Sequence, residues 1–527
     1  MRSRCIRWSF AAPTAVLLLI LAAPALADPG PGEASFAARV RDAVVRAELR
    51  LTATELDTPP GRYAYYTTGP YGQAWKYTGP TGWAAGYVPA GMWSCYQLTG
   101  QDWWRRRAAE RQAAISRQTL SPESLNVGAL FYPSLVRGYK LTGDDRLRTR
   151  ALTAAGHMAG RYDPVVGAML SRPGTDFNVI VDSLMKSQFL WWAARSGGDP
   201  GWAEIARRHA LTIARDFVRA DGSTYQVVYY DRATGAVTRR GPGSAYSEES
   251  TWARGQAWAM LGFANAYRET RLPGFLGVAR DVCDWYLANL PEDAVPYWDF
   301  AAPDVPLAPR DSSAAAIAAV ALLDLAQTEQ DRDNAQRYEA AARRMLATLM
   351  TADYSSPAWG PAVLAHGTYS WRLNVADRGL AYGDAYFLEA LLRLRRFEPA
   401  APRLALAEAR ASSGDAGAAV DGDAGTAWTA AGRQTLDLRL ATGRREVGAV
   451  RVALLKGDSC ATLLDVLVST DGVRWQPVAR ATTSGETVAP ETFDFAPVPA
   501  RWVRLVVAGT THGMAAEIAE VQVYPAL

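Results

Sequence analysis

Histidine and cysteine are scarce in this sequence of 527 residues. Only four histidines occur, and chains so poor in histidine rarely build histidine-ligated zinc sites or Ser-His-Asp triads. Of the four cysteines, Cys5 lies in an N-terminal apolar segment, which leaves Cys95, Cys283 and Cys460 widely separated. This odd, scattered set argues against a disulfide framework and against a cysteine metal site. Stability must therefore come from ordinary hydrophobic cores.

The sequence also lacks an excess of charge and long apolar runs. Its 56 basic and 53 acidic residues give a net charge of +3, which is no nucleic-acid signature. Beyond the N-terminal segment, no run of about 18 apolar residues could span a membrane. We therefore expect no nucleic-acid partner, no membrane partner and a monomeric protein.

The N-terminal segment has the pattern of a signal peptide. Three arginines precede the apolar run AAPTAVLLLILAAP, and the small-residue sequence ALA follows at residues 25–27. This pattern predicts a signal peptide over residues 1–27 and a mature chain that begins near Asp28. We expect a secreted protein, either extracellular or periplasmic.

Aromatic residues, by contrast, are abundant. The chain has 18 tryptophans and 23 tyrosines, and flat aromatic rings are suited to stacking on sugars. With histidine and cysteine chemistry disfavoured, carboxylates are the expected source of acid and base groups.

Apolar residues recur with helical spacing through most of the chain up to about residue 395. Six helical hairpins can close into a double-layered barrel, and twelve helices are predicted. Their approximate spans are 35–56, 85–98, 102–118, 124–141, 145–160, 179–196, 201–219, 248–269, 273–289, 312–327, 333–350 and 380–395.

Long aromatic loops lie between these helices, and we place the binding site there. The segment STYQVVYYDRATGAVTRR predicts a hairpin that turns at Asp231, Thr234 and Gly235. From about residue 403 the chain alternates apolar and polar residues, as an antiparallel sandwich does, with a turn at Asp471 and Gly472. The predicted domains are 28–398, helical, and 403–527, all β.

The segment SEESTWARGQAWAM, residues 247–260, places polar side chains between tryptophans. Spacing of four residues pairs Trp252 with Gln256 and Arg254 with Trp258 on two faces of a helix. Ser247, followed by two glutamates, is typical of a helix start. The alternative is that the arginine only stacks on an indole at the surface.

This segment, continued as STWARGQAWAMLGFANAY, closely resembles the signature of unsaturated glucuronyl hydrolases, glycoside hydrolase family 88. Further blocks in the same order support the resemblance, which covers roughly residues 85–396. They are GALFYPSLVRGYKLTGDDRLRTRALTAA, RYDPVVGAML, NVIVDSLMKSQFLWWA, RDSSAAAIAAVALLDL and YGDAYFLEALLRL. The resemblance implies an (α/α)6 barrel.

The C-terminal part resembles the discoidin, or F5/8 type C, domain through ARASSGDAGAAVDGDAGTAWT, VSTDGVRWQPV and ARWVRLVV. In such enzymes this jelly-roll sandwich usually acts as a carbohydrate-binding module. Its VDGDAGTAW loop would make Asp421 and Asp423 candidates for a structural calcium. The alternative is that these aspartates only cap turns.

The family resemblance implies an activity, the hydration of the C4=C5 double bond of a terminal unsaturated uronic acid on lyase-generated oligosaccharides. No cofactor is expected for this catalysis. Asp182, in VIVDSLMK, matches the catalytic acid and base, and burial among apolar neighbours would raise its pKa. The alternative is an aspartate that only favours a helix start, the role that we assign to Asp311; Glu389 is also expected to be structural.

We expect the substrate-binding residues to include Arg254 and Gln256 as polar contacts to the uronate or its hydroxyls, and Trp252 and Trp258 as stacking walls. The remaining candidates are Ser244 and Tyr246. Arg254 tying loops together is the alternative for that residue. Further candidates for anion contact are Arg172, Lys186 and Arg372.

The sequence also departs from the family pattern. A second carboxylate is expected in a His-Asp-x-Gly-Phe context, but Leu125 and Asn126 replace the histidine and the aspartate. A neutral amide cannot raise a neighbour's pKa by like-charge repulsion, although Asn126 could orient Asp182 through a hydrogen bond. Gly243 and Ser244 stand where the family tends to have a His-Gln pair.

Three functions therefore remain open. The first is an active unsaturated uronyl hydrolase with altered specificity. The second is another carbohydrate-active enzyme on the same barrel, a rhamnogalacturonyl-type hydrolase or a lyase, in which Glu248, Glu249 or Tyr246 replaces the missing aspartate. The third is a glycan-binding protein without catalysis, which Asn126 and the added module would suit.

Overall fold

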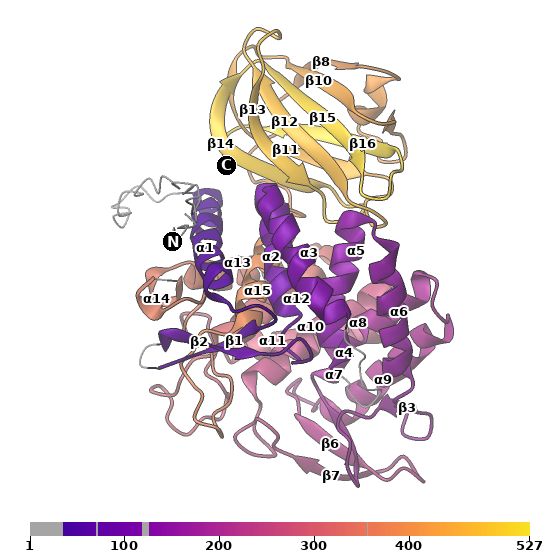
Figure 1. Cartoon of the computed structure of the whole chain (residues 1–527), viewed down its shortest axis with the longest axis vertical. Coiled ribbons are helices and arrows are strands. Elements are labelled where there is room, and N and C mark those ends of the chain that lie inside the picture. The colour runs from indigo at the N-terminus through magenta and orange to yellow at the C-terminus, as the bar shows by residue number, and fades with distance from the viewer. Residues whose placement is uncertain (1–34, 70–71, 118–125, 356) are drawn as a thin grey trace, which may run out of the picture.

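The computed structural model describes residues 35–527 except 70–71, 118–125 and 356, and it has a helical domain below a β-sandwich (Figure 1). The predicted signal peptide and Leu125 lie outside the described residues. No helix in the described ranges is long and apolar enough to cross a membrane. Each of the twelve segments predicted to be helical does contain a helix.

Helices alternate along the chain between an outer and an inner layer. The outer helices bury one stripe each, as α13 does with Tyr338, Ala342 and Met345. They are α1 (Phe36–Asp57), α3 (Asp102–Ser116), α6 (Asp145–Ala159), α9 (Gly201–Phe217), α11 (Pro273–Ala288) and α13 (Arg332–Leu349). This layer covers the inner one and faces solvent with its polar side.

The inner helices are more deeply buried than the outer ones, and the longest buried run among them is apolar with little amphipathic pattern. In α12, every residue from Ser312 to Ala326 is buried. The inner helices are α2 (Tyr87–Thr99), α4 (Val127–Phe131) with η2 (Tyr132–Val136) and α5 (Arg137–Thr142), α7 (Ser183–Lys186) with α8 (Gln188–Arg195), α10 (Ala253–Thr270), α12 (Ser312–Thr328) and α15 (Ala381–Leu394). The two layers form the (α/α)6 barrel that the family resemblance implied.

Two predicted helix starts are wrong. The segment predicted to be helical from 179 begins as strand β5 (Phe177–Ile180), because its β-branched residues pair with β6 (Val227–Tyr230). The helix predicted from 248 begins at Ala253. Asp299 accepts hydrogen bonds from the Tyr246 amide and the Ser250 hydroxyl, which holds the preceding residues in a turn. Ser247 therefore closes that turn and does not cap α10.

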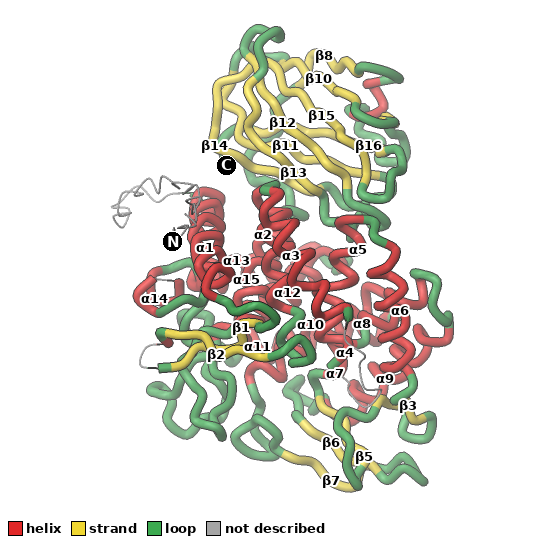
Figure 2. The backbone as a smooth tube through the Cα atoms, in the orientation of Figure 1, coloured by secondary structure: helices red, strands yellow, loops and turns green. Residues whose placement is uncertain are grey.

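The predicted hairpin is confirmed. Strand β6 pairs with β7 (Val237–Gly241), and the turn between them contains Gly235, whose φ of +73° suits glycine. The other short strands are β1 (Tyr63–Thr68), β2 (Ala74–Thr78), β3 (Tyr162–Asp163) and β4 (Ala168–Met169). Figure 2 shows these strands and the long loops gathered at the end of the barrel away from the sandwich.

The C-terminal domain is an antiparallel sandwich, as predicted. One sheet has the strand order β13-β12-β15-β10-β8 and the other β14-β11-β16-β9, around an apolar core of their inward residues. The strands are β8 (Leu406–Ala411), β9 (Trp428–Ala430), β10 (Gln434–Leu440), β11 (Arg445–Leu454), β12 (Thr462–Ser469), β13 (Gln476–Thr482), β14 (Glu491–Ala500), β15 (Trp502–Thr510) and β16 (Ala516–Tyr524). Gly472, in the predicted turn, has a φ of +78°.

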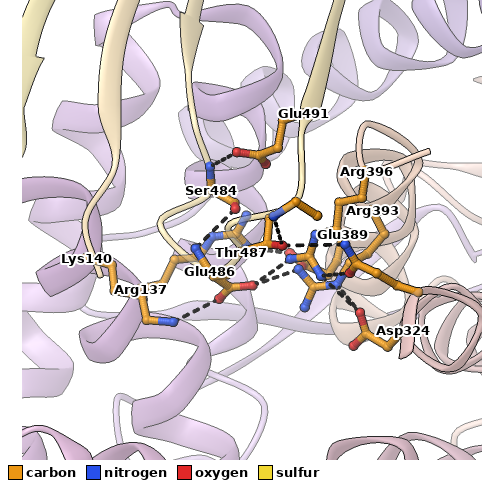
Figure 3. A network of polar contacts seen from close by, with 12 residues as sticks. Arg137, Lys140, Asp324, Glu389, Arg393, Arg396, Ser484, Glu486, Thr487 and Glu491 are labelled. Carbon is orange, nitrogen blue, oxygen red and sulfur yellow. Dashed lines mark hydrogen bonds and ion pairs between the residues drawn. The ribbon is translucent and has the colours of Figure 1, made fainter. Parts of the chain in front are cut away.

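A loop of the sandwich inserts a carboxylate among the cations at the base of the barrel (Figure 3). Glu486, between β13 and β14, forms ion pairs with Lys140 at 3.3 Å, Arg393 at 2.7 Å and Arg396 at 3.1 Å. Burial opposes its ionisation, but these cations hold the pKa of Glu486 well below its usual range. The two domains are thus joined by a buried polar network.

Candidate active site

A cavity of about 660 Å³ opens at the N-terminal ends of the inner helices, opposite the sandwich. Helix N-termini present a positive dipole end, so this end of the barrel favours anionic groups. The cavity is lined by Trp83, Asn126, Ser171, Arg172, Pro173, Ile180, Asp182, Met185, Lys186, Ser244, Trp252, Arg254, Trp258, Tyr369, Ser370 and Leu373. Six of the eight site residues expected in the barrel line this cavity, and two do not. Those that line it are Asn126, Asp182, Ser244, Trp252, Arg254 and Trp258, whereas Tyr246 and Gln256 lie outside the lining.

Asp182 lies between strand β5 and α7, at the N-cap position of α7, and its side chain lines the cavity. It makes no capping hydrogen bond, and its Oδ1 is buried without a partner among the described residues. Burial raises the pKa of Asp182, although Lys186, Arg254 and Arg172 act in the opposite direction. A carboxyl group in this setting can hold a proton and donate it into the cavity.

Arg254 lines the cavity between Trp252 and Trp258, but its guanidinium is already engaged by the protein. It stacks over Trp252 at 4.5 Å from the ring centroid and forms a buried ion pair with Asp311. It also donates to the carbonyls of Thr368 at 2.6 Å and Tyr369 at 2.9 Å. The geometry is that of a residue that ties the loop before α15 to α10 and α12.

Asp311 has the helix-start position that was predicted for it. It is the N-cap of α12, and its Oδ1 accepts hydrogen bonds from the Ala314 amide and the Ser313 hydroxyl. Glu389 is also paired within the protein, with Arg137 at 2.6 Å and Arg393 at 2.8 Å. Both carboxylates lie outside the cavity lining.

Gln256 does not line the cavity, so its position does not suit the expected contact with substrate. It is fully buried on the far side of α10. Its amide donates to the carbonyls of Gly222 and Val282 and accepts from the Thr224 hydroxyl. Trp252 and Gln256 are four residues apart as expected, but only Trp252 lines the cavity, because Gln256 is bonded to the neighbouring protein.

Ser244 lines the cavity, whereas Tyr246 lies on the outer side of the same loop with 45% of its surface exposed. The carbonyls of Ala245 and Tyr246 accept hydrogen bonds from Arg372. Arg372 therefore fastens the loop of residues 366–378 over the loop of residues 243–247. Glu248 and Glu249 are exposed and are not among the lining residues.

Asn126 directly precedes α4 and lines the cavity together with Asp182, and the hydrogen bond expected between them stays a prediction. Two cations that the sequence placed only loosely, Arg172 and Lys186, also line it. Arg172 is exposed at the edge of the cavity, while Lys186 is buried. The lining thus contains one carboxylate, one neutral amide and several cations.

The sequence profile of Glycosyl Hydrolase Family 88 matches residues 63–367, and that of the F5/8 type C domain matches residues 405–521. The chain belongs to glycosyl hydrolase family 88.

This family 88 enzyme is similar in sequence to several named hydrolases. An unsaturated glucuronyl hydrolase of Formosa agariphila is 34% identical over 321 residues, which are 59% of this chain and 79% of the relative. One from Bacillus sp. (strain GL1) is 33% identical, over 60% of this chain and 86% of the relative. An unsaturated chondroitin disaccharide hydrolase of Streptococcus pyogenes serotype M1 is 33% identical, over 59% and 80%.

Solved structures agree with these relatives. An unsaturated glucuronyl hydrolase specific for heparin superimposes with a TM-score of 0.64 at 30% identity, covering 67% of this chain and 96% of that one. The enzyme from Bacillus sp. GL1 gives 0.63 at 29% identity, covering 68% and 97%. The family 88 enzyme described here is accordingly a glycoside hydrolase with a helical barrel like that of the unsaturated glucuronyl hydrolases.

Three aromatic residues at the cavity wall, Tyr65, Trp83 and Tyr369, were not predicted from the sequence. Trp83 and Tyr369 line the cavity in this family 88 enzyme, and Tyr65 joins them. The Tyr65 hydroxyl donates to that of Tyr369 at 2.6 Å and accepts from the Trp83 indole at 2.8 Å. Their loops were identified as a binding face from composition, but residues so distant in sequence carry no spacing signal.

The candidate calcium ligands of the F5/8 type C domain lie in a tight loop. Asp421 accepts hydrogen bonds from the Asp423 amide and the Thr426 hydroxyl, and Asp423 accepts one from the Gly425 amide. Within the described residues, no group of three or more His, Cys, Asp or Glu is placed to hold a metal. Both carboxylates thus cap turns, the alternative raised for them, and calcium binding there stays a prediction.

Proposed function

We propose that this family 88 enzyme hydrates the C4=C5 double bond of a terminal unsaturated uronic acid on oligosaccharides that a polysaccharide lyase has released. The observation that carries the proposal is Asp182, a carboxyl group with a raised pKa and an unpartnered buried oxygen in the wall of a sugar-sized cavity. The activity printed in the names of its relatives supports the same reaction.

The substrate is a vinyl ether, so its reactive carbon is C4. Protonated Asp182 donates its proton to C4, and the electron pair of the double bond forms the new C–H bond, which leaves an oxocarbenium ion at C5. Water adds to C5, and its proton passes to the carboxylate of Asp182. The resulting hemiketal opens and releases the sugar, so that one water molecule is consumed and the acid is regenerated.

The rest of the setting follows the sequence-based expectations. We infer that the enzyme is secreted, acts as a monomer on uronic acid oligosaccharides or polysaccharides, and has neither a nucleic-acid nor a membrane partner. Its C-terminal domain would hold the enzyme on a glycan, and a calcium ion at Asp421 and Asp423 would be structural.

The test is a time course of the ultraviolet absorbance of the conjugated double bond. Lyase-digested chondroitin, hyaluronan, heparosan, gellan and ulvan are each offered to wild type and to Asp182→Asn. Loss of absorbance with wild type alone is expected. A gain of absorbance on intact polymers would identify a lyase instead, and equal loss with both proteins would remove Asp182 from the mechanism.

Asn126 favours a second candidate, a glycan-binding protein without catalysis. With an amide in place of a carboxylate, the described lining of the cavity offers no second carboxylate that could act as a base. Binding of the same oligosaccharides, measured by calorimetry and accompanied by unchanged absorbance on every substrate, would establish that candidate.

A further inference from the structure

Lys186 is a buried cation beside Asp182 that the proposed reaction has not yet used. The two residues are at the ends of α7, four positions apart, and both line the cavity. Residues separated by four positions on a helix have side chains on one face, with Cβ atoms about 5–6 Å apart. The ammonium of Lys186 and the carboxyl of Asp182 therefore face the same part of the cavity.

The ammonium of Lys186 forms no direct ion pair in the part of the chain that the structure describes, although the charge of Asp182 acts on it. The residue is only 5% exposed, yet no described residue forms an ion pair or accepts a hydrogen bond from it. Arg161 and Arg172 add like charge nearby, and burial lowers the pKa of Lys186 while the charge of Asp182 opposes that shift. The Nζ of Lys186 is not one of the buried polar atoms without a partner in the described residues, so the ammonium opens onto the cavity, where it can meet an anionic group.

The backbone around Lys186 is shaped to hold it in place. Gly128 packs directly on Lys186, and a Cβ at Gly128 would lie 2.7 Å from the Cβ of Lys186. Only glycine allows α4 to approach α7 this closely. Asn126, two residues before Gly128, lines the same cavity as Lys186 and adds no negative charge to it.

The other cation deep in the cavity is already neutralised. Arg254 is paired with buried Asp311 and bound to two carbonyls, so most of its donors are taken. Among the described lining residues, Lys186 and the exposed Arg172 are cations without an ion pair, and Asp182 is the one carboxyl group. An anionic group of the substrate is what this arrangement lacks.

We propose that Lys186 binds the carboxylate of the uronic acid and is a specificity-determining residue of this enzyme. The inference rests on the proposed function, because it concerns the same ring. In an unsaturated uronate, the carboxylate is attached to C5, the neighbour of the carbon that is protonated. A cation one helical turn from the acid is thus at the correct spacing to hold that carboxylate while Asp182 faces C4.

The experiment measures binding by calorimetry in full-length variants that carry Asp182→Asn to prevent turnover. The ligands are the unsaturated disaccharides of chondroitin, hyaluronan and heparosan, each as the free acid and as the uronate methyl ester. With Lys186 present, the acid should bind about 10- to 100-fold more tightly than the ester, as expected for a charge-assisted hydrogen bond. Lys186→Met should reduce this preference to less than about threefold, and Lys186→Arg should keep part of it.

Arg172→Met is the matched control, since it removes a cation at the edge of the same cavity and should change the preference much less. Thermal unfolding shows whether each variant is folded, and Lys186→Arg keeps the test open if Lys186→Met is not. An unchanged preference in Lys186→Met overturns the assignment, as does equal binding of acid and ester with Lys186 present. If Lys186→Met loses the preference but wild type turns over none of the substrates, only the proposed function is overturned. If no variant binds any of the acids, the proposed function and the role of Lys186 are both overturned.

Discussion

Asp182 makes the enzyme's chemistry depend on pH in a definite direction. Because burial raises the pKa of its carboxyl group, the acid form needed for proton donation persists to a higher pH than in an exposed aspartate. We expect kcat to fall as the pH rises through that pKa. Asp182→Asn should lower kcat by about 10²- to 10⁴-fold, the usual contribution of a general acid.

The same carboxyl group should make folding less favourable at neutral pH. With a folded-state pKa above the unfolded one, the folded state binds more protons between the two values, so stability falls as the pH rises through that window. Asp182→Asn removes this loss. Its Tm should exceed that of wild type at neutral pH, and the difference should vanish below the ordinary pKa of aspartate; a Tm below wild type at both pH values would contradict the assignment.

Arg254 offers a direct test of whether a cavity arginine is structural. Arg254→Met leaves Asp311 buried and without its counter-ion, which should cost about 3–5 kcal/mol of unfolding free energy. Arg254→Met with Asp311→Asn should recover part of that loss, because the remaining charge is removed. Denaturant unfolding measures both variants. If stability is unchanged while KM rises sharply, Arg254 contacts the substrate instead of tying loops.

At the scale of elements, the sequence predicted helices better than it predicted where they begin. The twelve helical segments were found because each keeps an apolar pattern over several turns. The predicted start at 248 was wrong because Asp299 holds residues 247–250 in a turn through hydrogen bonds. Asp299 lies about fifty residues later in the chain, so the local sequence does not reveal this contact. The helix predicted from 179 also begins later, because residues 177–180 pair with the distant strand β6.

The site was predicted in part for the same reason. Asp182, Trp252 and Trp258 lie in continuous motifs and do line the cavity. Gln256 lies in the same motif, but its side chain points into the protein. Sequence could not predict this, because nearly all residues of α10 are buried and no pattern marks those that meet the cavity. The burial of Lys186 and the pairing of Arg254 with Asp311 depend on contacts between distant elements.

The loop between β13 and β14 carries the connection between the domains. Glu486→Gln would leave Lys140, Arg393 and Arg396 without their shared anion, and we expect a loss of about 3–5 kcal/mol. The pKa of Glu486 is lowered in the folded state, so its contribution is present above the ordinary pKa of glutamate and is lost as the pH falls through the folded value.

The control for this loop is Glu517→Gln, which breaks an ion pair with the more exposed Lys456 on the same domain. Such a pair contributes about 0–1 kcal/mol. Calorimetric scans of both variants should show a clear shift for Glu486→Gln only. Equal shifts would mean that the buried network adds nothing to the coupling of the domains.

At the scale of the whole molecule, the sandwich and the barrel approach each other closely at the end of α5. Gly143, at the end of α5, has a φ of +70°, and a Cβ there would lie 2.3 Å from the carbonyl oxygen of Thr511 in the sandwich. Gly143→Ala should therefore push the domains apart. Two separate unfolding transitions should replace a joint one.

Gly443→Ala is the matched control for that variant. Gly443 lies in a sandwich turn with a φ of +74° and has open space around it, so alanine there meets the same backbone cost without a clash. Scanning calorimetry compares the two proteins. If both variants unfold as wild type does, apart from a similar drop in Tm, the contact at Gly143 does not hold the domains together.

The three buried cysteines give each domain its own chemical reporter. Cys95 and Cys283 lie in the barrel and Cys460 in the sandwich, all as free thiols, and burial raises the pKa of each. Alkylating reagents should reach them only when the surrounding structure opens. Mass spectrometry of a partly denatured sample would then show which domain opens first, with no label added to the chain.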